Sequence, residues 1–141
     1  MNQRNVMIVD DEPHVIRILR LMLEREGYLV TTANDGHEAL RLMEARVPDV
    51  MVTDIQMAGM DGRALCHEAR ARYPLHRFPI LVMTSMTALS ERAWARELAD
   101  TEFLEKPLSP RQLVARLARH FAAPEFAVPS NPSAPEAANV A

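Results

Sequence analysis

Cysteine occurs only once in this chain, as Cys66, so the protein cannot form an internal disulfide. A chain without disulfides is typical of a reducing compartment, and Cys66 is expected to be a small buried apolar residue on a helix. No hydrophobic run approaches the roughly 18 residues that a membrane-spanning helix needs. The N-terminal segment MNQRNVMIVDDEP reaches two aspartates after a short apolar run, which argues against a signal peptide. We therefore expect a cytoplasmic protein without membrane insertion.

The chain also lacks a strong excess of charge of either sign. Its 16 basic and 19 acidic side chains give a net charge of −3 at pH 7. A protein that binds nucleic acid through the phosphates carries a clearly basic surface, so we expect no direct binding of nucleic acid by this chain. Hydrophobic residues make up 48% of the 141 residues, which suits one domain with its own core in a chain too short for two.

Lysine is the scarcest basic residue, because Lys106 is the only lysine and every other basic side chain is arginine. It lies in the stretch FLEKPL, directly before Pro107. A composition so rich in arginine indicates a coding bias against lysine, and one exception can arise by chance. Lys106 therefore counts as a functional signal only if other residues give an ammonium group something to bind.

Short apolar runs alternate with segments of helical period. Most of the runs are continuously apolar, as in strands buried on both faces of a parallel sheet, and they cover residues 6–9, 28–33, 50–53, 80–84 and 102–105. Helices are predicted after each run, beginning near Pro13, Gly36, Asp61, Ser90 and Pro110. Asp35 and Asp61 are assigned to helix starts rather than to chemistry. The pattern predicts an α/β fold of five β-α units, a parallel sheet with helices on both faces.

The composition changes at Pro124. The last segment, APEFAVPSNPSAPEAANVA, contains several prolines, no lysine or arginine, and almost no apolar period. Such a composition is typical of a disordered tail or the start of a linker. We therefore predict one folded domain at residues 1–123 and a disordered Pro/Ala-rich tail at residues 124–141.

Four of the five predicted strands end in a residue with a charged or reactive side chain. The first ends at Asp10 and Asp11, the third at Asp54, the fourth at Thr84 and the fifth at Lys106. In an open α/β sheet, ligands bind outside the carboxyl ends of the strands. A single aspartate at such a place is more often a turn residue or a helix cap. Five suitable residues at the same edge of one sheet instead predict a pocket.

The residue types in this predicted pocket fit one reaction. Three carboxylates at close quarters repel one another and need a hard cation, and ligands that are all oxygen favour Mg²⁺ over zinc. A carboxylate can act as a nucleophile and form an aspartyl phosphate, beside a cation that neutralises charge on the phosphoryl group. A hydroxyl and an ammonium remain to hold the other phosphoryl oxygens. The pocket is therefore predicted to accept a phosphoryl group.

Together, the motifs MIVDDEP, VTDIQMAGMDG, VMTS and FLEKPLS resemble the receiver domain of bacterial two-component response regulators. The resemblance spans about residues 4–122 and implies a flavodoxin-like fold with strand order 2-1-3-4-5. It implies that Asp54 accepts a phosphoryl group from a sensor histidine kinase or a histidine phosphotransfer protein. The protein would then switch a binding surface for a downstream protein. It would not be an enzyme beyond its own phosphorylation and dephosphorylation.

The resemblance also implies how the cation is held. Asp11 and Asp54 would bind Mg²⁺ directly, Asp10 would act through water, and the backbone carbonyl of Gln56 would be a further ligand. Ala58 stands where the family often has proline, which implies a looser loop after the acceptor. This departure removes no core residue of the motif set, so phosphorylation remains expected.

On the opposite side of the pocket, Thr84 and Phe103 would form a switch pair. The hydroxyl would move toward the phosphoryl group while the ring turns inward, and Lys106 would contact first the acceptor carboxylate and then a phosphoryl oxygen. Ser85 stands where alanine or glycine is usual, so its hydroxyl would narrow the mouth of the pocket or hydrogen-bond there. Met86 stands where some relatives have an acid or amide that orients water, which implies a more persistent phosphorylated state.

Two other functions stay open on the sequence. The chain could be the receiver part of a longer regulator with a DNA-binding or enzymatic output, and the full gene length would decide this. It could instead be a Mg²⁺-dependent phosphatase with an aspartyl intermediate. Such enzymes usually need a second carboxylate near the nucleophile as general acid, whereas position 56 is glutamine. Turnover of a phosphomonoester would distinguish this second alternative.

Overall fold

The computed structural model describes residues 3–85, 93, 100–106 and 109–122. The chain forms two compact units, Met1–Pro110 and Arg111–Ala141. Within the described ranges, the first unit contains the sheet and three complete helices, and α5 (Pro110–Ala122) begins at the boundary and continues into the second. Met86, the helix predicted near Ser90, and the predicted tail lie outside the described residues.

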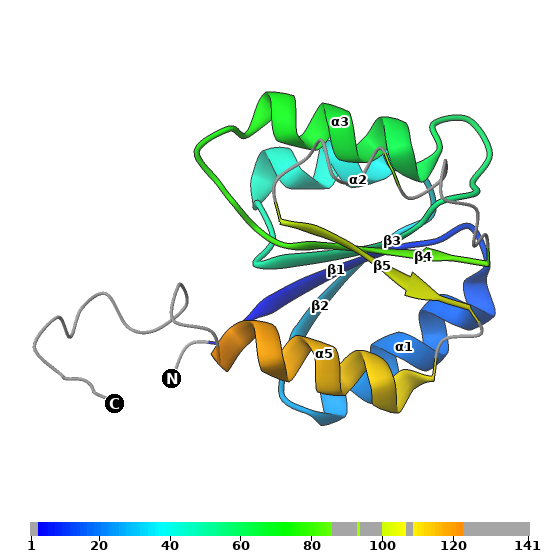
Figure 1. Ribbon diagram of the computed structural model, residues 1–141, viewed down its shortest axis with the longest axis vertical. Coiled ribbons are helices and arrows are strands. Elements are labelled where there is room, and N and C mark those ends of the chain that lie inside the picture. Colours follow the sequence, from blue (N-terminus) through cyan, green and yellow to red (C-terminus); the bar gives the residue numbers. More distant parts are fainter. Residues whose placement is uncertain (1–2, 86–92, 94–99, 107–108, 123–141) are drawn as a thin grey trace, which may run out of the picture. The chain divides into compact units, whose positions relative to one another are not determined.

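The first unit is built on a sheet of five parallel strands (Figure 1). The strand order is β2-β1-β3-β4-β5, which confirms the flavodoxin-like topology. The strands are β1 (Asn5–Val9), β2 (Leu29–Ala33), β3 (Val50–Asp54), β4 (Ile80–Thr84) and β5 (Thr101–Glu105). Each differs from its predicted apolar run by at most one residue at either end.

The burial of each strand follows its place in the sheet. Every residue of β1, β3 and β4 is buried, as expected for apolar strands that are covered on both faces. The two edge strands, β2 and β5, are partly exposed. The sequence TEFLE of β5 can therefore carry two glutamates without placing either charge in the core.

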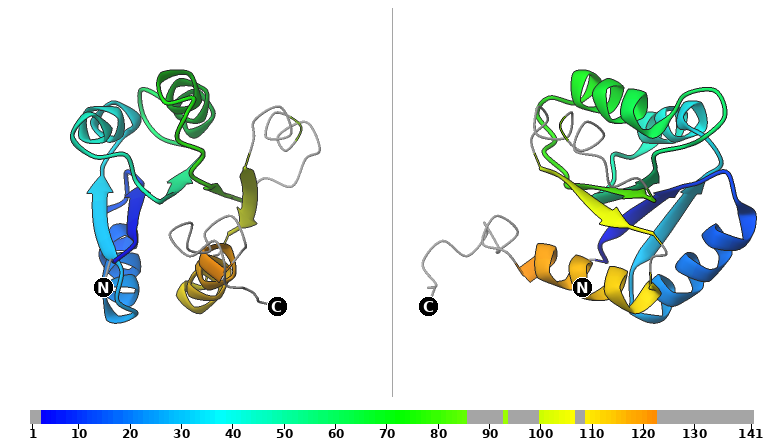
Figure 2. Two further views of the ribbon diagram at one scale, coloured as in Figure 1. Left: turned by 90° about the vertical axis from the view of Figure 1, so that its left-hand side faces the viewer. Right: turned by 45° about the vertical axis from the view of Figure 1, so that its right-hand side comes forward.

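Helices cover both faces of the sheet, as predicted. α1 (Pro13–Arg25) lies on one face, and α2 (Gly36–Ala45) and α3 (Gly62–Arg72) lie on the other (Figures 1 and 2). The buried residues of α1 are spaced three and four positions apart, on one side of the helix, and are Ile16, Leu19 and Leu23. An amphipathic helix of this kind is stabilised mainly by the apolar face that it packs against the sheet.

Two aspartates fix the starts of α2 and α3. Asp35 Oδ1 accepts a hydrogen bond from the Glu38 N–H at 2.8 Å, and Asp61 Oδ1 accepts one from the Ala64 N–H at 2.8 Å. Each bond satisfies a backbone donor that has no partner inside the first turn of the helix. The prediction that both aspartates serve helix starts is confirmed.

A continuous apolar core includes buried residues of the sheet, α2 and α3. Cys66 of α3 is fully buried in this core, which confirms its predicted role as a small apolar residue. Burial raises the pKa of its thiol to about 12, so the thiol stays protonated and unreactive at neutral pH.

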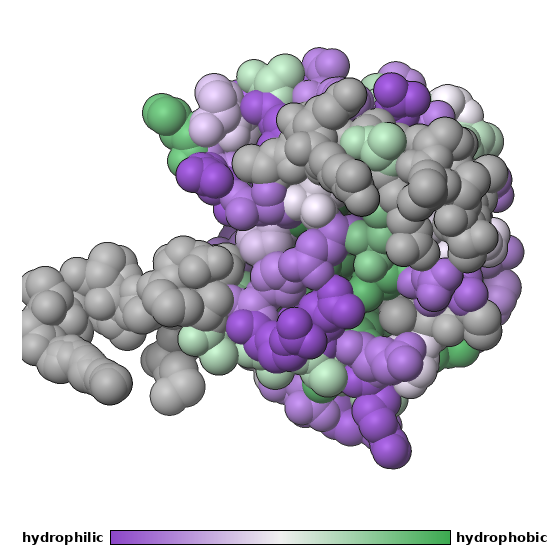
Figure 3. All heavy atoms as spheres, in the orientation of Figure 1, coloured by the Kyte–Doolittle hydropathy of each residue, from purple (hydrophilic) through white to green (hydrophobic). Residues whose placement is uncertain are grey.

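The surface differs from this core in composition. On the face shown in Figure 3, hydrophilic residues predominate among those drawn in colour. Within the described part of the chain, every helix is too short or too polar to cross a membrane.

Candidate functional site

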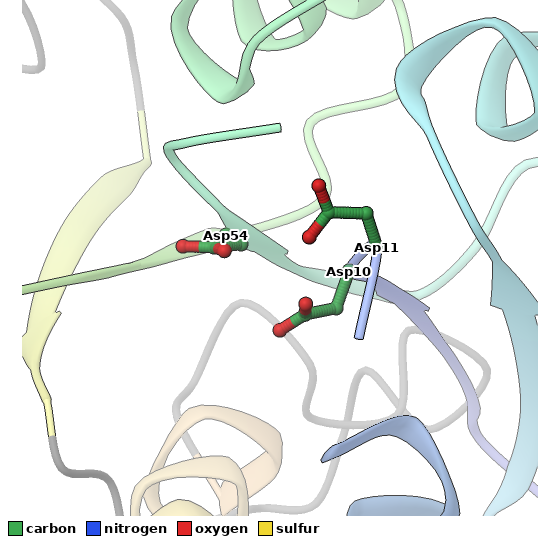
Figure 4. Close-up of side chains that lie close together, drawn as sticks. All are labelled: Asp10, Asp11 and Asp54. Carbon is green, nitrogen blue, oxygen red and sulfur yellow. The ribbon is translucent and has the colours of Figure 1, made fainter. Parts of the chain in front are cut away.

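Three carboxylates meet at the carboxyl ends of two neighbouring strands. Asp10 and Asp11 directly follow β1, and Asp54 is the last residue of β3, which pairs with β1 in parallel. One oxygen from each of the three carboxylates lies within 4.8 Å of the others. Figure 4 shows the three side chains gathered around one common space. The predicted acidic cluster is therefore present, at the edge of the sheet where it was expected.

The three carboxylates differ in their exposure. Asp10 is fully buried and Asp54 is 4% exposed, whereas Asp11 is exposed. Asp10 Oδ1 accepts a hydrogen bond from the Glu12 N–H at 2.9 Å. Its other oxygen, Oδ2, is buried and has no hydrogen-bond partner among the described residues. A buried carboxylate oxygen without a donor is costly unless a cation or water satisfies it.

Burial is the main cause that raises the pKa of Asp10 above its ordinary value of 3.8. The hydrogen bond from the Glu12 N–H opposes this shift, the negative charge of Asp54 adds to it, and the positive charge of Lys106 opposes it. Glu12 also raises this pKa slightly through its negative charge. The site thus holds more negative charge than the described basic groups compensate.

Lys106 supplies the positive charge of the site. Its Nζ lies 2.9 Å from Asp54 Oδ1. The Lys106 N–H donates to the Thr84 carbonyl oxygen at 2.8 Å, one step beyond the pairing of Thr84 with Glu105. The parallel pairing of β5 with β4 therefore carries the lysine to the same edge as the carboxylates. The only lysine of the chain therefore has an anionic partner inside the site, which is the group for its ammonium to bind that the sequence alone could not establish.

The other predicted site residues lie on the same strands or directly after them. Thr84 is fully buried at the end of β4, and Phe103 is partly buried in β5, where it packs against the core. Gln56 is exposed two residues beyond Asp54. Ser85 is exposed directly after β4, as expected for a residue at the mouth of the site. The structure brings Thr84 and Phe103 onto adjacent strands, and the switch between them stays a prediction.

The backbone around Asp54 is also fixed by hydrogen bonds. The Thr53 hydroxyl donates to the Asp54 carbonyl oxygen at 2.9 Å, and the Ile55 N–H donates to the Met83 carbonyl oxygen at 3.1 Å. The Gly62 N–H donates to the Ile55 carbonyl oxygen at 2.8 Å. The closeness of Gly62 to the acceptor was not predicted, because only the preceding Asp61 was assigned, and only to the start of a helix. A glycine directly after an N-cap residue, where other residue types are common, was the available signal.

The donor set fits a hard divalent cation. Asp10, Asp11 and Asp54 offer only oxygen atoms, which magnesium and calcium prefer over softer ligands. The buried Oδ2 of Asp10 has no other partner among the residues described, and a cation would satisfy it. The residues present therefore fit a hard divalent cation such as the predicted Mg²⁺.

The chain has the parallel strand order β2-β1-β3-β4-β5 and a cluster of carboxylates at the carboxyl edge of the sheet. It is therefore a flavodoxin-like α/β protein with a carboxylate site that can hold a cation. The chain belongs to the response regulator receiver domain family, whose model matches residues 6–118. This is the receiver module of two-component signal transduction, and the resemblance seen in the sequence motifs is confirmed.

Two curated relatives are transcriptional regulators. The chain is 36% identical over 131 residues to the alkaline phosphatase synthesis transcriptional regulatory protein PhoP of Bacillus subtilis (strain 168), covering 93% of this chain and 53% of PhoP. It is 38% identical over 115 residues to the probable transcriptional regulator ycf27 of Guillardia theta, covering 82% of this chain and 44% of the relative. The chain thus spans about half the length of these relatives.

Two similar solved structures are covered almost completely by this chain. The chemotaxis protein CheY4 of Vibrio cholerae matches with a TM-score of 0.77 and 30% identity, over 84% of this chain and 98% of CheY4. A response regulator from Chloroflexus aurantiacus, described in its title as putative, matches with a TM-score of 0.77 and 32% identity, over 86% of this chain and 100% of that one. These matches agree with the strand order of the sheet.

Proposed function

We propose that this protein is a phosphoryl-accepting signalling receiver. Asp54 takes a phosphoryl group from a sensor histidine kinase or a histidine phosphotransfer protein. The observation that carries the proposal is the pairing of the nearly buried Asp54 carboxylate with Lys106 at 2.9 Å, with Asp10 and Asp11 beside it. A carboxylate held between a cationic side chain and an acidic cluster is suited to nucleophilic attack on phosphorus.

The transfer step uses the carboxylate of Asp54. Lys106 engages Oδ1, which leaves Oδ2 to attack the phosphorus of a phosphohistidine. The new O–P bond forms as the N–P bond breaks, and the imidazole leaves with the electron pair of that bond and takes up a proton from solvent. The product is an aspartyl phosphate on this chain and a neutral histidine on the donor.

The remaining side chains hold the phosphoryl group and the cation. Asp10, Asp11, Asp54 and the backbone carbonyl of Gln56 would hold Mg²⁺, and the bound ion supplies positive charge next to the phosphoryl oxygens. Lys106 stabilises a second phosphoryl oxygen after the transfer.

Signalling follows from the residues on β4 and β5. The hydroxyl of Thr84 donates to a phosphoryl oxygen, and its movement leaves space for the ring of Phe103 to turn inward. The described positions support this proposal because the two residues lie on adjacent strands, with Thr84 buried and Phe103 packed against the core. The altered surface then binds a downstream protein in the cytoplasm.

The receiver domain proper is proposed to occupy residues 1–123, followed by the Pro/Ala-rich tail. The two transcriptional regulators that match along about half of their length favour a second candidate, in which this receiver serves an output domain. The length of the natural gene product distinguishes the two candidates.

A phosphatase is disfavoured because Gln56 cannot act as a general acid, so the protein should not turn over a phosphomonoester.

Phosphotransfer from histidine kinases tests the proposed function. Each histidine kinase of the host is first loaded with radiolabelled phosphoryl from ATP and then mixed with the protein. At least one kinase should pass its label to the wild type and not to Asp54→Ala. The proposal fails if no kinase transfers label, or if the alanine variant accepts it equally well.

A further inference from the structure

The first residue of α3 touches the backbone of the phosphoryl acceptor. A Cβ atom built on Gly62 would lie 2.3 Å from the Asp54 carbonyl oxygen and 2.7 Å from the Ile55 Cα. Real Cβ atoms essentially never approach another heavy atom more closely than 3.0 Å, and both distances are shorter than this. Because the atoms in the way belong to the backbone, they cannot turn aside. Any side chain at position 62 would force α3 or the acceptor strand to move.

Gly36 provides an internal comparison for this contact. It occupies the same place in α2 as Gly62 does in α3, directly after an aspartate N-cap. A Cβ on Gly36 would meet the side chain of Met60, with its sulfur at 2.8 Å. The sulfur and Cγ of Met60 can move aside in another rotamer, and its Cβ, at 3.0 Å, must give by only a few tenths of an ångström. The two glycines therefore share a local role in their helices but differ in what lies behind them.

The acceptor has little freedom to absorb a displacement. Its carbonyl oxygen accepts the hydrogen bond from Thr53 at 2.9 Å, and the next residue is bonded both to Met83 and to Gly62. The carboxylate is nearly buried and is paired with Lys106. A shift of the backbone at this point therefore moves the carboxylate relative to the lysine and to the acidic pair.

We propose that Gly62 is a positioning residue for phosphoryl transfer. Its lack of a side chain lets α3 begin in contact with the Asp54 carbonyl group, and this contact sets where the Asp54 carboxylate stands. The inference rests on the function proposed above, because it concerns the same acceptor. A misplacement of the reacting atom by about 1 Å can slow a reaction by about a hundredfold.

Initial rates of phosphoryl uptake test the inference. The wild type, Gly62→Ala and Gly36→Ala are incubated with acetyl phosphate and Mg²⁺, and the adduct is followed by intact mass. We expect Gly62→Ala to react at least about tenfold more slowly than the wild type. Gly36→Ala should stay within about twofold of it, because only a flexible side chain must move. A wild-type rate in Gly62→Ala overturns the inference and leaves the proposed function intact.

A third variant separates positioning from the stability of α3. Asp61→Ala removes the N-cap hydrogen bond to the Ala64 N–H without adding an atom near Asp54. It should lower the thermal midpoint yet keep a rate within about twofold of the wild type. If Asp61→Ala slows uptake as much as Gly62→Ala does, the glycine acts only through helix stability and the inference is wrong.

A measurement on the wild type covers the case in which Gly62→Ala does not fold. The backbone amide resonance of Gly62 should shift when acetyl phosphate and Mg²⁺ produce the adduct, because its N–H is bonded to the residue after the acceptor. The amide of Gly27, which precedes β2 at the opposite edge of the sheet, serves as the reference and should not shift. A Gly62 resonance that stays unchanged while the adduct forms contradicts the inference. Wild-type protein that forms no adduct overturns the proposed function and this inference together.

Discussion

Among the individual residues, Lys106 carries the most specific chemistry outside the carboxylates. Its ammonium group is a compact charge that reaches Asp54 Oδ1 at 2.9 Å while its side chain remains 31% exposed. Arginine supplies every other basic side chain of the chain, yet a guanidinium group is a broad planar fork that needs more space. The Lys106 backbone is hydrogen-bonded directly to the carbonyl oxygen of buried Thr84, which fixes the point from which the side chain reaches toward Asp54.

We expect Lys106→Arg to fold and to bind Mg²⁺, but to take up phosphoryl about tenfold or more slowly and to lose the coupling to Thr84 and Phe103. The measurements are adduct formation by intact mass and any phosphorylation-dependent binding of a partner. Arg72→Lys is the matched control. Arg72 forms an exposed ion pair with Glu68 at 2.9 Å, so this exchange should change neither phosphoryl uptake nor partner binding. A full wild-type response in Lys106→Arg would show that the lone lysine reflects composition only.

Asp10 is the carboxylate of the site whose ionised form burial destabilises most clearly. Because its pKa in the folded protein lies above the unfolded value, its ionisation lowers stability as the pH rises through that raised pKa. The cost grows as the pH rises above the ordinary pKa of 3.8, so it is present at pH 7. We therefore expect Asp10→Asn to raise the free energy of unfolding at pH 7 in metal-free buffer, by about 1 kcal/mol or more.

The same variant should lose the stabilisation by magnesium. A ligand at 100 times its Kd stabilises the folded state by about 2.7 kcal/mol, so Mg²⁺ should raise the Tm of the wild type clearly and that of Asp10→Asn much less. Asp11→Asn is the control. Because Asp11 is exposed, this variant should also lose the stabilisation by Mg²⁺, but its free energy of unfolding in metal-free buffer should not rise. An undiminished magnesium effect in Asp10→Asn would contradict the assignment of this carboxylate to the cation site.

Among the helices, α2 shows how local sequence fixes an element beside the site. Asp35 caps the first turn through the Glu38 N–H at 2.8 Å, and the Glu38 carboxylate in turn accepts from the Asn34 N–H at 2.6 Å. These two bonds satisfy donors that the helix itself leaves without partners. These bonds therefore hold the short connection between the end of β2 at Ala33 and the start of α2 at Gly36.

Replacing Asp35 with alanine should lower the free energy of unfolding by about 1 kcal/mol, because the capping bond is lost. Chemical denaturation monitored by circular dichroism measures the change. Glu44→Ala on the exposed side of the same helix is the control and should stay within about 0.5 kcal/mol of the wild type. Equal stability of Asp35→Ala and the control would mean that the cap contributes nothing in solution.

The strands could be predicted from sequence because buried parallel strands are continuously apolar, as in VMIV and ILVMT. The run EFLE was shorter and carries two glutamates, which an edge strand tolerates. The strand order followed from the family resemblance, because apolar period alone does not state which strands are neighbours. The N-caps were predictable because aspartate before a helical segment has a specific local role.

For the molecule as a whole, the sequence predicted which side chains meet but not how they meet. The positions of Asp10, Asp54, Thr84 and Lys106 follow from one rule, that parallel strands end at a common edge. Two features depend on distances between α3, β1 and β3. They are the Oδ2 of Asp10, which lacks a hydrogen-bond partner in the part of the chain that the structure describes, and the contact of Gly62 with the acceptor backbone. No local pattern encodes such distances, so they became visible only in the folded chain.

The central claim is that Asp54 is the residue that becomes phosphorylated and that a divalent cation is required. Incubation with acetyl phosphate, followed by borohydride reduction and peptide mass analysis, tests this directly, since reduction converts an aspartyl phosphate into homoserine at the modified position. We predict homoserine at position 54 in the presence of Mg²⁺, and none in EDTA or in Asp54→Ala. A covalent adduct that persists in Asp54→Ala, or that forms equally well in EDTA, would contradict the account.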